Sequence, residues 1–210
     1  QRDTLMLRQV VQHVLDAPVS MTTPMFMLRN EVMADDNYND VVGSVGMDAS
    51  LTAICVCCHV LREVMVIAIP VWLQQRLRAV LNKDDEGVLH GCVFTIAVME
   101  YFAVPAAQLQ WGKQWKKLGL KYVDMYIDNE NAQHWITKGY ASSQIGQDLC
   151  LLSGGLEFVG GYKCQGKRVS TELNQFTDTG SRIVGSDGRV IPEELEDFNA
   201  LHNSYEFPYQ

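Results

Sequence analysis

The sequence has no run of about 18 uncharged apolar residues, the length that a membrane-spanning helix requires. Its most apolar stretch, residues 51–73, is broken by Arg62 and Glu63 and has the length of two buried strands joined by a hairpin. We therefore expect no membrane segment. The chain begins with Gln1 and shows no signal peptide, and we interpret it as a fragment or a processed piece of a larger protein.

A Cys/His set with the spacing of a zinc site is also absent among the six cysteines. Cys55, Cys57 and Cys58 lie inside an apolar run, which predicts reduced thiols in the core. Reduced thiols are typical of a reducing compartment. We therefore expect an intracellular protein, in the cytoplasm or the nucleus.

The chain lacks an excess of positive charge, since its net charge is −8. That balance argues against a protein that coats phosphates non-specifically. It is compatible with an enzyme of nucleic acids, because a metal site made of carboxylates itself adds negative charge. Two basic segments, residues 113–121 and 163–168, stand out in this background. They are interpreted either as solvated surface charge or as contacts to a nucleic acid.

The 210 residues divide into three parts by pattern. Residues 1–40 form an N-terminal helical connector, with a helical pattern at residues 5–15. In residues 41–182, strands come first and then alternate with helices, which predicts an α/β domain with a mixed sheet. Residues 183–210 form a polar C-terminal tail.

Helix ends are predicted from glycine and proline. A buried helix is expected from residue 88 to 108, kinked or ended by Pro105. Gly139 is expected to end a helix over residues 129–138. A later helix begins near Ser142 and is interrupted at residues 154–155.

Four acids stand out by their context. Asp48 and Asp128 lie where predicted strands end, Asp178 lies near a helix start, and Glu100 lies inside an apolar helix. Burying Glu100 ionised and unpaired costs several kcal/mol, and no Lys or Arg stands three or four residues away. A bound Mg²⁺ would remove that cost, since hard cations prefer carboxylate oxygens. The alternatives are that Glu100 lies at the solvent edge of its helix and that Asp128 or Asn129 only caps one.

Four stretches occur in a fixed order along the chain: MDAS at residues 47–50, IAVMEYFAV at 96–104, YIDNENAQHWITKG at 126–139 and LNQFTDTGSR at 173–182. Together they resemble the motifs of the ribonuclease H domain of retroelement reverse transcriptases, closest to the DIRS and gypsy-like groups. The resemblance covers about residues 41–182. It implies a ribonuclease H-like fold, a mixed five-stranded sheet flanked by helices.

The resemblance also implies a chemistry, the hydrolysis of the RNA strand of an RNA–DNA hybrid by two Mg²⁺ ions, with Mn²⁺ as an alternative. Asp48, Glu100, Asp128 and Asp178 are then the catalytic metal ligands. Asp48 would bridge the ions, Glu100 and Asp128 would complete one site, and Asp178 the other. Ser50 and Asn129 are candidates for contacts to 2′-hydroxyls. An upstream polymerase region is the expected partner.

The chain departs from the family in several places. Arg168 stands where a His is common, Thr177 and Gly180 replace Ala and Leu of the last motif, and residues 73–87 look like an insertion. Two other interpretations stay open. One is an inactive ribonuclease H-like scaffold, which usually lacks one or more of the acids. The other is a transposase or integrase, whose acid triad ends in Glu.

Aromatic residues give two further expectations. Trp111 and Trp115 are four residues apart, so they lie on one helical face either as core anchors or as a platform for nucleic acid. His134 and Trp135 are expected to pack their helix against the sheet, with His134 disfavoured as a metal ligand.

Overall fold

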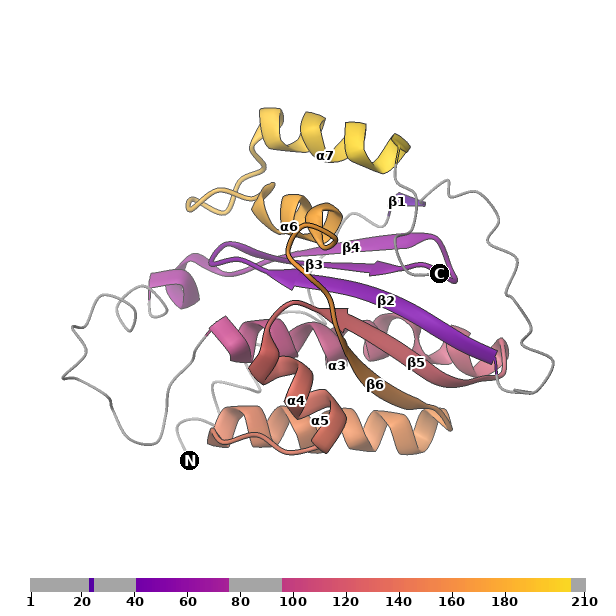
Figure 1. Cartoon of the computed structure of the whole chain (residues 1–210). Coiled ribbons are helices and arrows are strands. Elements are labelled where there is room, and N and C mark those ends of the chain that lie inside the picture. Colours follow the sequence, from indigo (N-terminus) through magenta and orange to yellow (C-terminus); the bar gives the residue numbers. More distant parts are fainter. Residues whose placement is uncertain (1–22, 25–40, 76–95, 205–210) are drawn as a thin grey trace.

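Five strands of six to nine residues form a mixed sheet in the computed structural model, which describes residues 23–24, 41–75 and 96–204 (Figure 1). The strands are β2 (Val41–Ala49), β3 (Ala53–Cys58), β4 (Glu63–Ala68), β5 (Leu120–Ile127) and β6 (Lys163–Arg168). The two-residue strand β1 (Thr23–Pro24) pairs with the outer side of β4. The class is α/β, as predicted from the sequence.

The strand order is β1-β4-β3-β2-β5-β6. β3 runs antiparallel to both β2 and β4, as the predicted hairpin requires, whereas β5 is parallel to β2 and to β6. The carboxyl ends of β2, β4, β5 and β6 therefore meet at one edge of the sheet. This order and these directions are compatible with the ribonuclease H-like fold.

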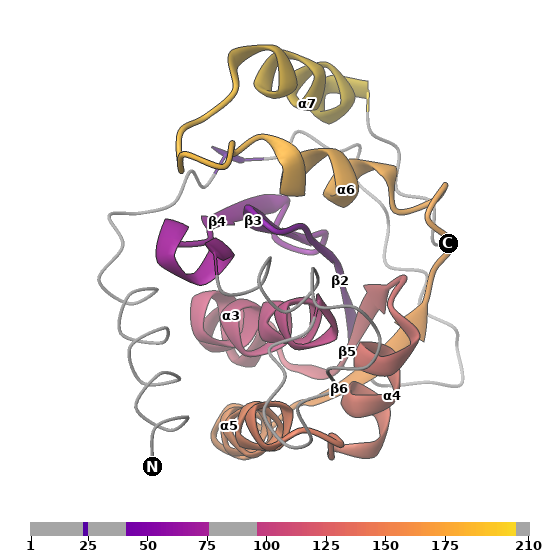
Figure 2. The same cartoon turned by 90° about the vertical axis from the view of Figure 1, so that its left-hand side faces the viewer.

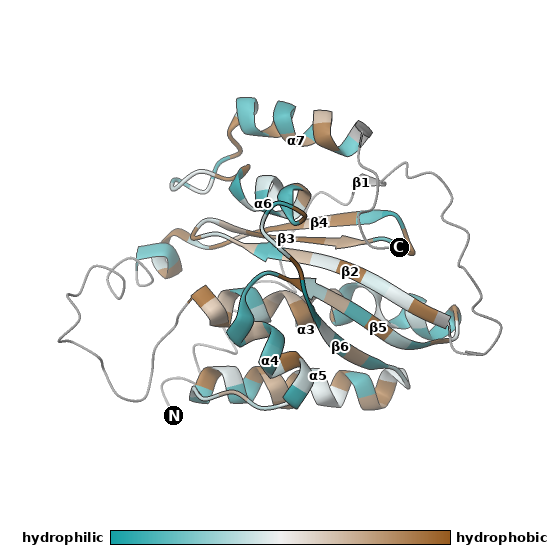
Figure 3. Cartoon of the chain, in the orientation of Figure 1, coloured by the Kyte–Doolittle hydropathy of each residue, from teal (hydrophilic) through white to brown (hydrophobic). Residues whose placement is uncertain are grey.

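Helices cover both faces of the sheet (Figures 1 and 2). On one side lie α3 (Ile96–Lys117), α4 (Glu130–Lys138) and α5 (Gln144–Gly160). On the other side lie the shorter α6 (Gln175–Arg182) and α7 (Pro192–Ser204). Hydrophobic residues follow the central strands between these two layers, while α4 and α6 are more hydrophilic (Figure 3).

Strand β3 separates two hydrophobic cores. Because side chains alternate along a strand, Ile54 and Val56 face the core that contains α3, and Cys55 and Cys57 face the core under α6 and α7. All six side chains of β3 are buried, which explains why its sequence is a continuous apolar run rather than an alternating pattern.

Helix α3 does not end at Pro105 but continues to Lys117, so the prediction of a helix end there is wrong. The second half is held by tertiary contacts of two buried side chains. The Trp111 indole donates a hydrogen bond to the Glu63 carboxylate at 2.6 Å, and the Trp115 indole donates to the Cys58 sulfur at 3.4 Å. Both tryptophans are therefore core anchors, the first of the two interpretations.

Two other local predictions fail. Helix α5 runs through residues 154–155 and ends at Gly161, which has a φ of 75°. Its intact course follows from the burial of Leu149 and Ser153 on its inner side. His134 is exposed, so only Trp135 packs inward, edge-on to Tyr101 at 5.9 Å between ring centroids.

Some expectations fall on parts of the chain that the structure does not describe. They are the helical pattern at residues 5–15, the start of the Glu100 helix at residue 88 and most of the insertion at residues 73–87.

The stretch expected to be a polar tail contains α7, which packs on α6. Phe198 of α7 is buried and lies 4.9 Å from Phe176 of α6, between ring centroids. His202 stacks on the same ring at 6.1 Å. Helix α7 therefore completes the second core and holds α6 against the sheet.

Gly180 allows α6 to approach β3 closely. A Cβ at this position would overlap the Cys55 sulfur and lie 2.8 Å from Phe198 Cε2. The Leu that the last ribonuclease H motif has at this position would not fit here, because Phe198 occupies the space beside residue 180.

We predict that Gly180→Ala lowers the free energy of unfolding by about 1–3 kcal/mol, because overpacking a dense core forces its neighbours to move. Urea denaturation measures the change. The matched control is Gly154→Ala, where a new Cβ meets no atom within 4 Å and should stabilise the helix by up to about 1 kcal/mol. Equal stability of Gly180→Ala and the wild type would contradict this account of the packing.

Candidate metal centre

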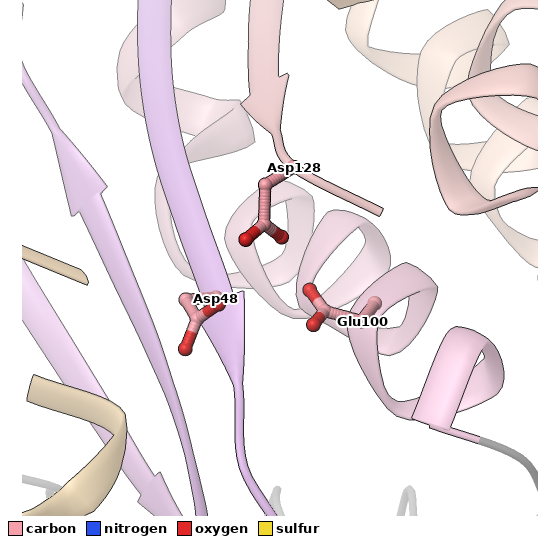
Figure 4. A group of neighbouring side chains, drawn as sticks. All are labelled: Asp48, Glu100 and Asp128. Carbon is pink, nitrogen blue, oxygen red and sulfur yellow. The ribbon is translucent and has the colours of Figure 1, made fainter. Parts of the chain in front are cut away.

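Three acids converge at the edge where the strands end (Figure 4). Asp48 is the penultimate residue of β2, Asp128 directly follows β5, and Glu100 projects from the first half of α3. Because β2 and β5 are adjacent and parallel, their ends place the two aspartates side by side. One carboxylate oxygen from each of the three residues lies within 4.8 Å of the others.

Glu100 is buried without a partner for one of its oxygens. Its side chain is 4% exposed, and Oε2 accepts no hydrogen bond from the described residues. Burial, followed by the charges of Asp48 and Asp128, raises the pKa of Glu100 to about 9, against a weaker opposing hydrogen bond from the Ala49 backbone. The alternative that Glu100 lies at the solvent edge of its helix is therefore wrong.

Asp48 is almost as buried, at 6% exposure. Burial raises its pKa to about 6, and the nearby charges of Asp128 and Asp178 act in the same direction. The Ser181 hydroxyl opposes this by donating a hydrogen bond to Asp48 Oδ2 at 2.6 Å. Three carboxylates with one orphaned oxygen fit a hard divalent ion such as Mg²⁺ or Mn²⁺, which would offset their mutual repulsion when they are ionised.

Asp128 does not cap α4. The cap is Asn129, whose Oδ1 accepts a hydrogen bond from the Ala132 N–H at 3.1 Å. Asp128 instead accepts a hydrogen bond on Oδ2 from the Thr171 hydroxyl at 3.3 Å. The capping alternative therefore applies to Asn129, and Asp128 belongs to the acid cluster.

Asp178 lies outside the group of three. Its Oδ1 accepts a hydrogen bond from Arg182 Nη2 at 2.5 Å, one turn along α6. Asp178 is still close enough for its charge to raise the pKa of both Asp48 and Glu100. The structure therefore brings three of the four predicted ligands together and leaves the fourth in an ion pair beside them.

The last motif attaches α6 to β2 through Asn174 and two side chains that follow it by three and seven residues. Asn174 donates a hydrogen bond from Nδ2 to the Met47 carbonyl at 3.1 Å, and Thr177 orients Asn174 by donating to its Oδ1 at 2.7 Å. Ser181 then reaches Asp48. Sequence analysis did not assign these roles, although the Asn-x-x-Thr-x-x-x-Ser spacing places the three on one helical face.

The two residues predicted to bind 2′-hydroxyls already make structural contacts. The Ser50 hydroxyl donates to the Ser181 carbonyl at 2.6 Å and accepts the N–H of Thr52 at 3.0 Å. Asn129 uses its side-chain oxygen as the helix cap. Both lie beside the cluster, and the geometry gives each a local role in the fold.

A cavity of about 500 Å³ opens beside Asp128. It is lined by Asp128, Arg168, Val169, Ser170, Thr171 and Glu172. Arg168 is mostly exposed and lies 3.8 Å from Glu130. Of the three clustered acids, Asp128 alone lines this cavity, so the cavity reaches the cluster at that residue.

Surface charge is the better interpretation of the second basic segment. Lys163 pairs with Glu157 at 2.6 Å, and Lys167 lies 3.8 Å from Asp124. These acids offset much of the positive charge of β6.

No protein-family model matches the chain, and neither a curated protein nor a solved structure was found to match it. Among the helices of the described residues, none has both the length and the apolar character needed to cross a membrane.

The pKa of Glu100 predicts a pH dependence of stability in the absence of metal. The unfolded side chain loses its proton near pH 4.5, whereas the folded one keeps it up to about pH 9. The unfolded state therefore binds fewer protons in this window, and the free energy of unfolding falls as the pH rises. Glu100→Gln removes this contribution.

We predict that, from pH 5 to pH 8 in chelator, the wild type loses on the order of 2 kcal/mol more stability than Glu100→Gln. Urea denaturation at the two pH values measures the difference. Glu130→Gln, which removes an exposed carboxylate on α4, serves as the control and should follow the wild type. Parallel behaviour of Glu100→Gln and the wild type would show that Glu100 is not held protonated.

Proposed function

We propose that the protein is a metal-dependent ribonuclease H, which cleaves the RNA strand of RNA–DNA hybrids endonucleolytically as part of a retroelement reverse transcriptase. The observation that carries the proposal is the convergence of Asp48, Glu100 and Asp128 at one sheet edge, with an orphaned oxygen on Glu100. The order of the four motifs, on a compatible fold, points to this activity among the reactions that a carboxylate metal centre supports.

Each residue of the centre has a distinct task in this proposal. Asp48, Glu100 and Asp128 would hold the divalent ions, with Asp178 as the fourth ligand. Bound ions supply the activation of water and the neutralisation of the phosphate that hydrolysis of a phosphodiester requires. Ser181 fixes the Asp48 carboxylate and Thr171 holds Asp128. Glu100, whose pKa is raised to about 9, would have to give up its proton in order to hold a cation.

The proposed substrate and setting follow from the same resemblance. An RNA–DNA hybrid would enter over the cavity beside Asp128, and an upstream polymerase region would supply most of the affinity for it. The chain's net charge of −8 agrees with this, because an acidic chain binds the phosphates of a nucleic acid weakly by itself. Buried thiols at the five described cysteines agree with a reducing intracellular compartment, cytoplasm or nucleus.

A second candidate function, an inactive scaffold, is favoured by the outer surface of α5. Leu151, Phe158 and Val159 are 68%, 89% and 72% exposed there, and such apolar patches mark sites of protein interaction. The buried acid cluster weighs against this candidate, because a scaffold has no need to bury carboxylates at the cost of stability.

We predict that the protein cleaves the RNA strand of an end-labelled RNA–DNA hybrid in Mg²⁺, and that Asp128→Asn lowers the rate at least about 100-fold by removing a metal-holding charge. Gel electrophoresis of the labelled strand measures the rate. Asp124→Asn is the matched control, since Asp124 lies four residues before Asp128, within β5, and its carboxylate is 3.8 Å from the Lys167 ammonium. It should cleave like the wild type.

Two results would count against the proposal. Persistent hybrid binding without cleavage, in a polymerase-fused form as well as in the isolated chain, would favour the scaffold. Equal cleavage by Asp128→Asn and the wild type would assign the activity to a different site or to a contaminant.

A further inference from the structure

We infer that Arg182 makes the two metal positions unequal, because it competes with an ion for Asp178. This inference rests on the metal centre of the proposed function and adds a prediction about its stoichiometry. In the absence of nucleic acid, one divalent ion would bind at Asp48, Glu100 and Asp128. A second ion would bind more weakly, because Asp178 must first release Arg182.

The first observation is the separation of the fourth acid from the other three. Oxygens of Asp48, Glu100 and Asp128 already lie within 4.8 Å of one another, which is a preformed ligand set. Asp178 lies outside that set and makes a 2.5 Å hydrogen bond to Arg182. One metal position therefore has its three carboxylates in place, whereas the second depends on Asp178, which is already bound to Arg182.

The second observation concerns charge. Once an ion has displaced the proton of Glu100, the three carboxylates carry −3, so one divalent ion leaves −1 and a second would leave +1. Only the charge of Asp178 would bring the two-ion centre to neutrality, and in this structure Arg182 neutralises that charge. The charge of Arg182 also reaches the centre itself, because it lowers the pKa of Asp48.

The third observation is that the competition is weak enough to be overcome. The side chain of Arg182 is 60% exposed and that of Asp178 is 26% exposed. Ion pairs at such positions contribute little, since water and salt screen them. Arg182 therefore tunes the affinity of the second position and does not close it. When it leaves Asp178, its guanidinium is available to an incoming anion such as a phosphodiester.

Titration with Mn²⁺ alone tests the inference, with the free ion measured by electron paramagnetic resonance. The wild type should show two classes of site, with dissociation constants at least about tenfold apart. Arg182→Gln should lower the weaker constant about threefold to tenfold and leave the tighter one unchanged within about twofold. Asp178→Asn should abolish the weaker class alone, and Arg182→Lys, which keeps the charge, should lie between wild type and Arg182→Gln.

The matched control is Arg189→Gln, which makes the same change of net charge. Arg189 is exposed and lies 3.9 Å from Asp187 in the loop before α7. It should leave both constants unchanged. A thermal melt of each variant confirms that the chain is folded.

Several outcomes would overturn the inference. One is that the two classes of Mn²⁺ site in the wild type have equal dissociation constants. Another is that Arg182→Gln and Arg189→Gln have the same dissociation constants. Both would leave the proposed function intact, because the ions would still bind. No Mn²⁺ binding by the wild type would overturn the metal centre as well as the inference. The cleavage experiment in Mg²⁺ would then test separately whether the chain has nuclease activity.

Discussion

The parallel pairing of β2 with β5 is the constraint on which the rest of the site depends. It places Asp48 and Asp128, eighty residues apart in sequence, at the same sheet edge. Helix α3 packs on one face of the sheet, and its Glu100 side chain points toward the two aspartates (Figure 4). A one-residue shift in the register of β2 would turn Asp48 to the opposite face, so the sheet core indirectly fixes the ligand geometry.

Helices α6 and α7 form a second support for the same edge. The contacts of α6 to β2 are polar and specific, through Asn174 and Ser181, while the contacts of α7 to α6 are apolar, through Phe198 and Phe176. The apolar layer excludes water from the other side of the sheet, and the polar layer sets the direction of the Asp48 carboxylate. Stability and positioning are thus provided by neighbouring but different elements.

The sequence predicted those parts of the fold that depend on local pattern. A strand that ends beside Asp128 and a helix that stops at Gly139 were predicted from the local pattern, and β5 and α4 confirm both. It failed where tertiary contacts override local preference. Trp111 and Trp115 hold α3 together beyond Pro105, and burial of Leu149 carries α5 through two glycines. The acids were found by their odd context, but the ion pair of Asp178 depends on a side-chain conformation that no pattern encodes.

The cluster is also a local conflict within an otherwise consistent fold. Glu100 replaces an apolar contact in the core with a carboxyl group that stays protonated to about pH 9 and leaves one oxygen unpaired. A fold selected only for stability would place Gln or Leu there, because either avoids the cost of burying an ionisable group. The same residue becomes favourable only when a cation binds to the folded state, since a ligand of the native state adds its binding free energy to stability. The unfavourable burial of Glu100 therefore supports the proposal that a divalent ion binds at this edge of the sheet.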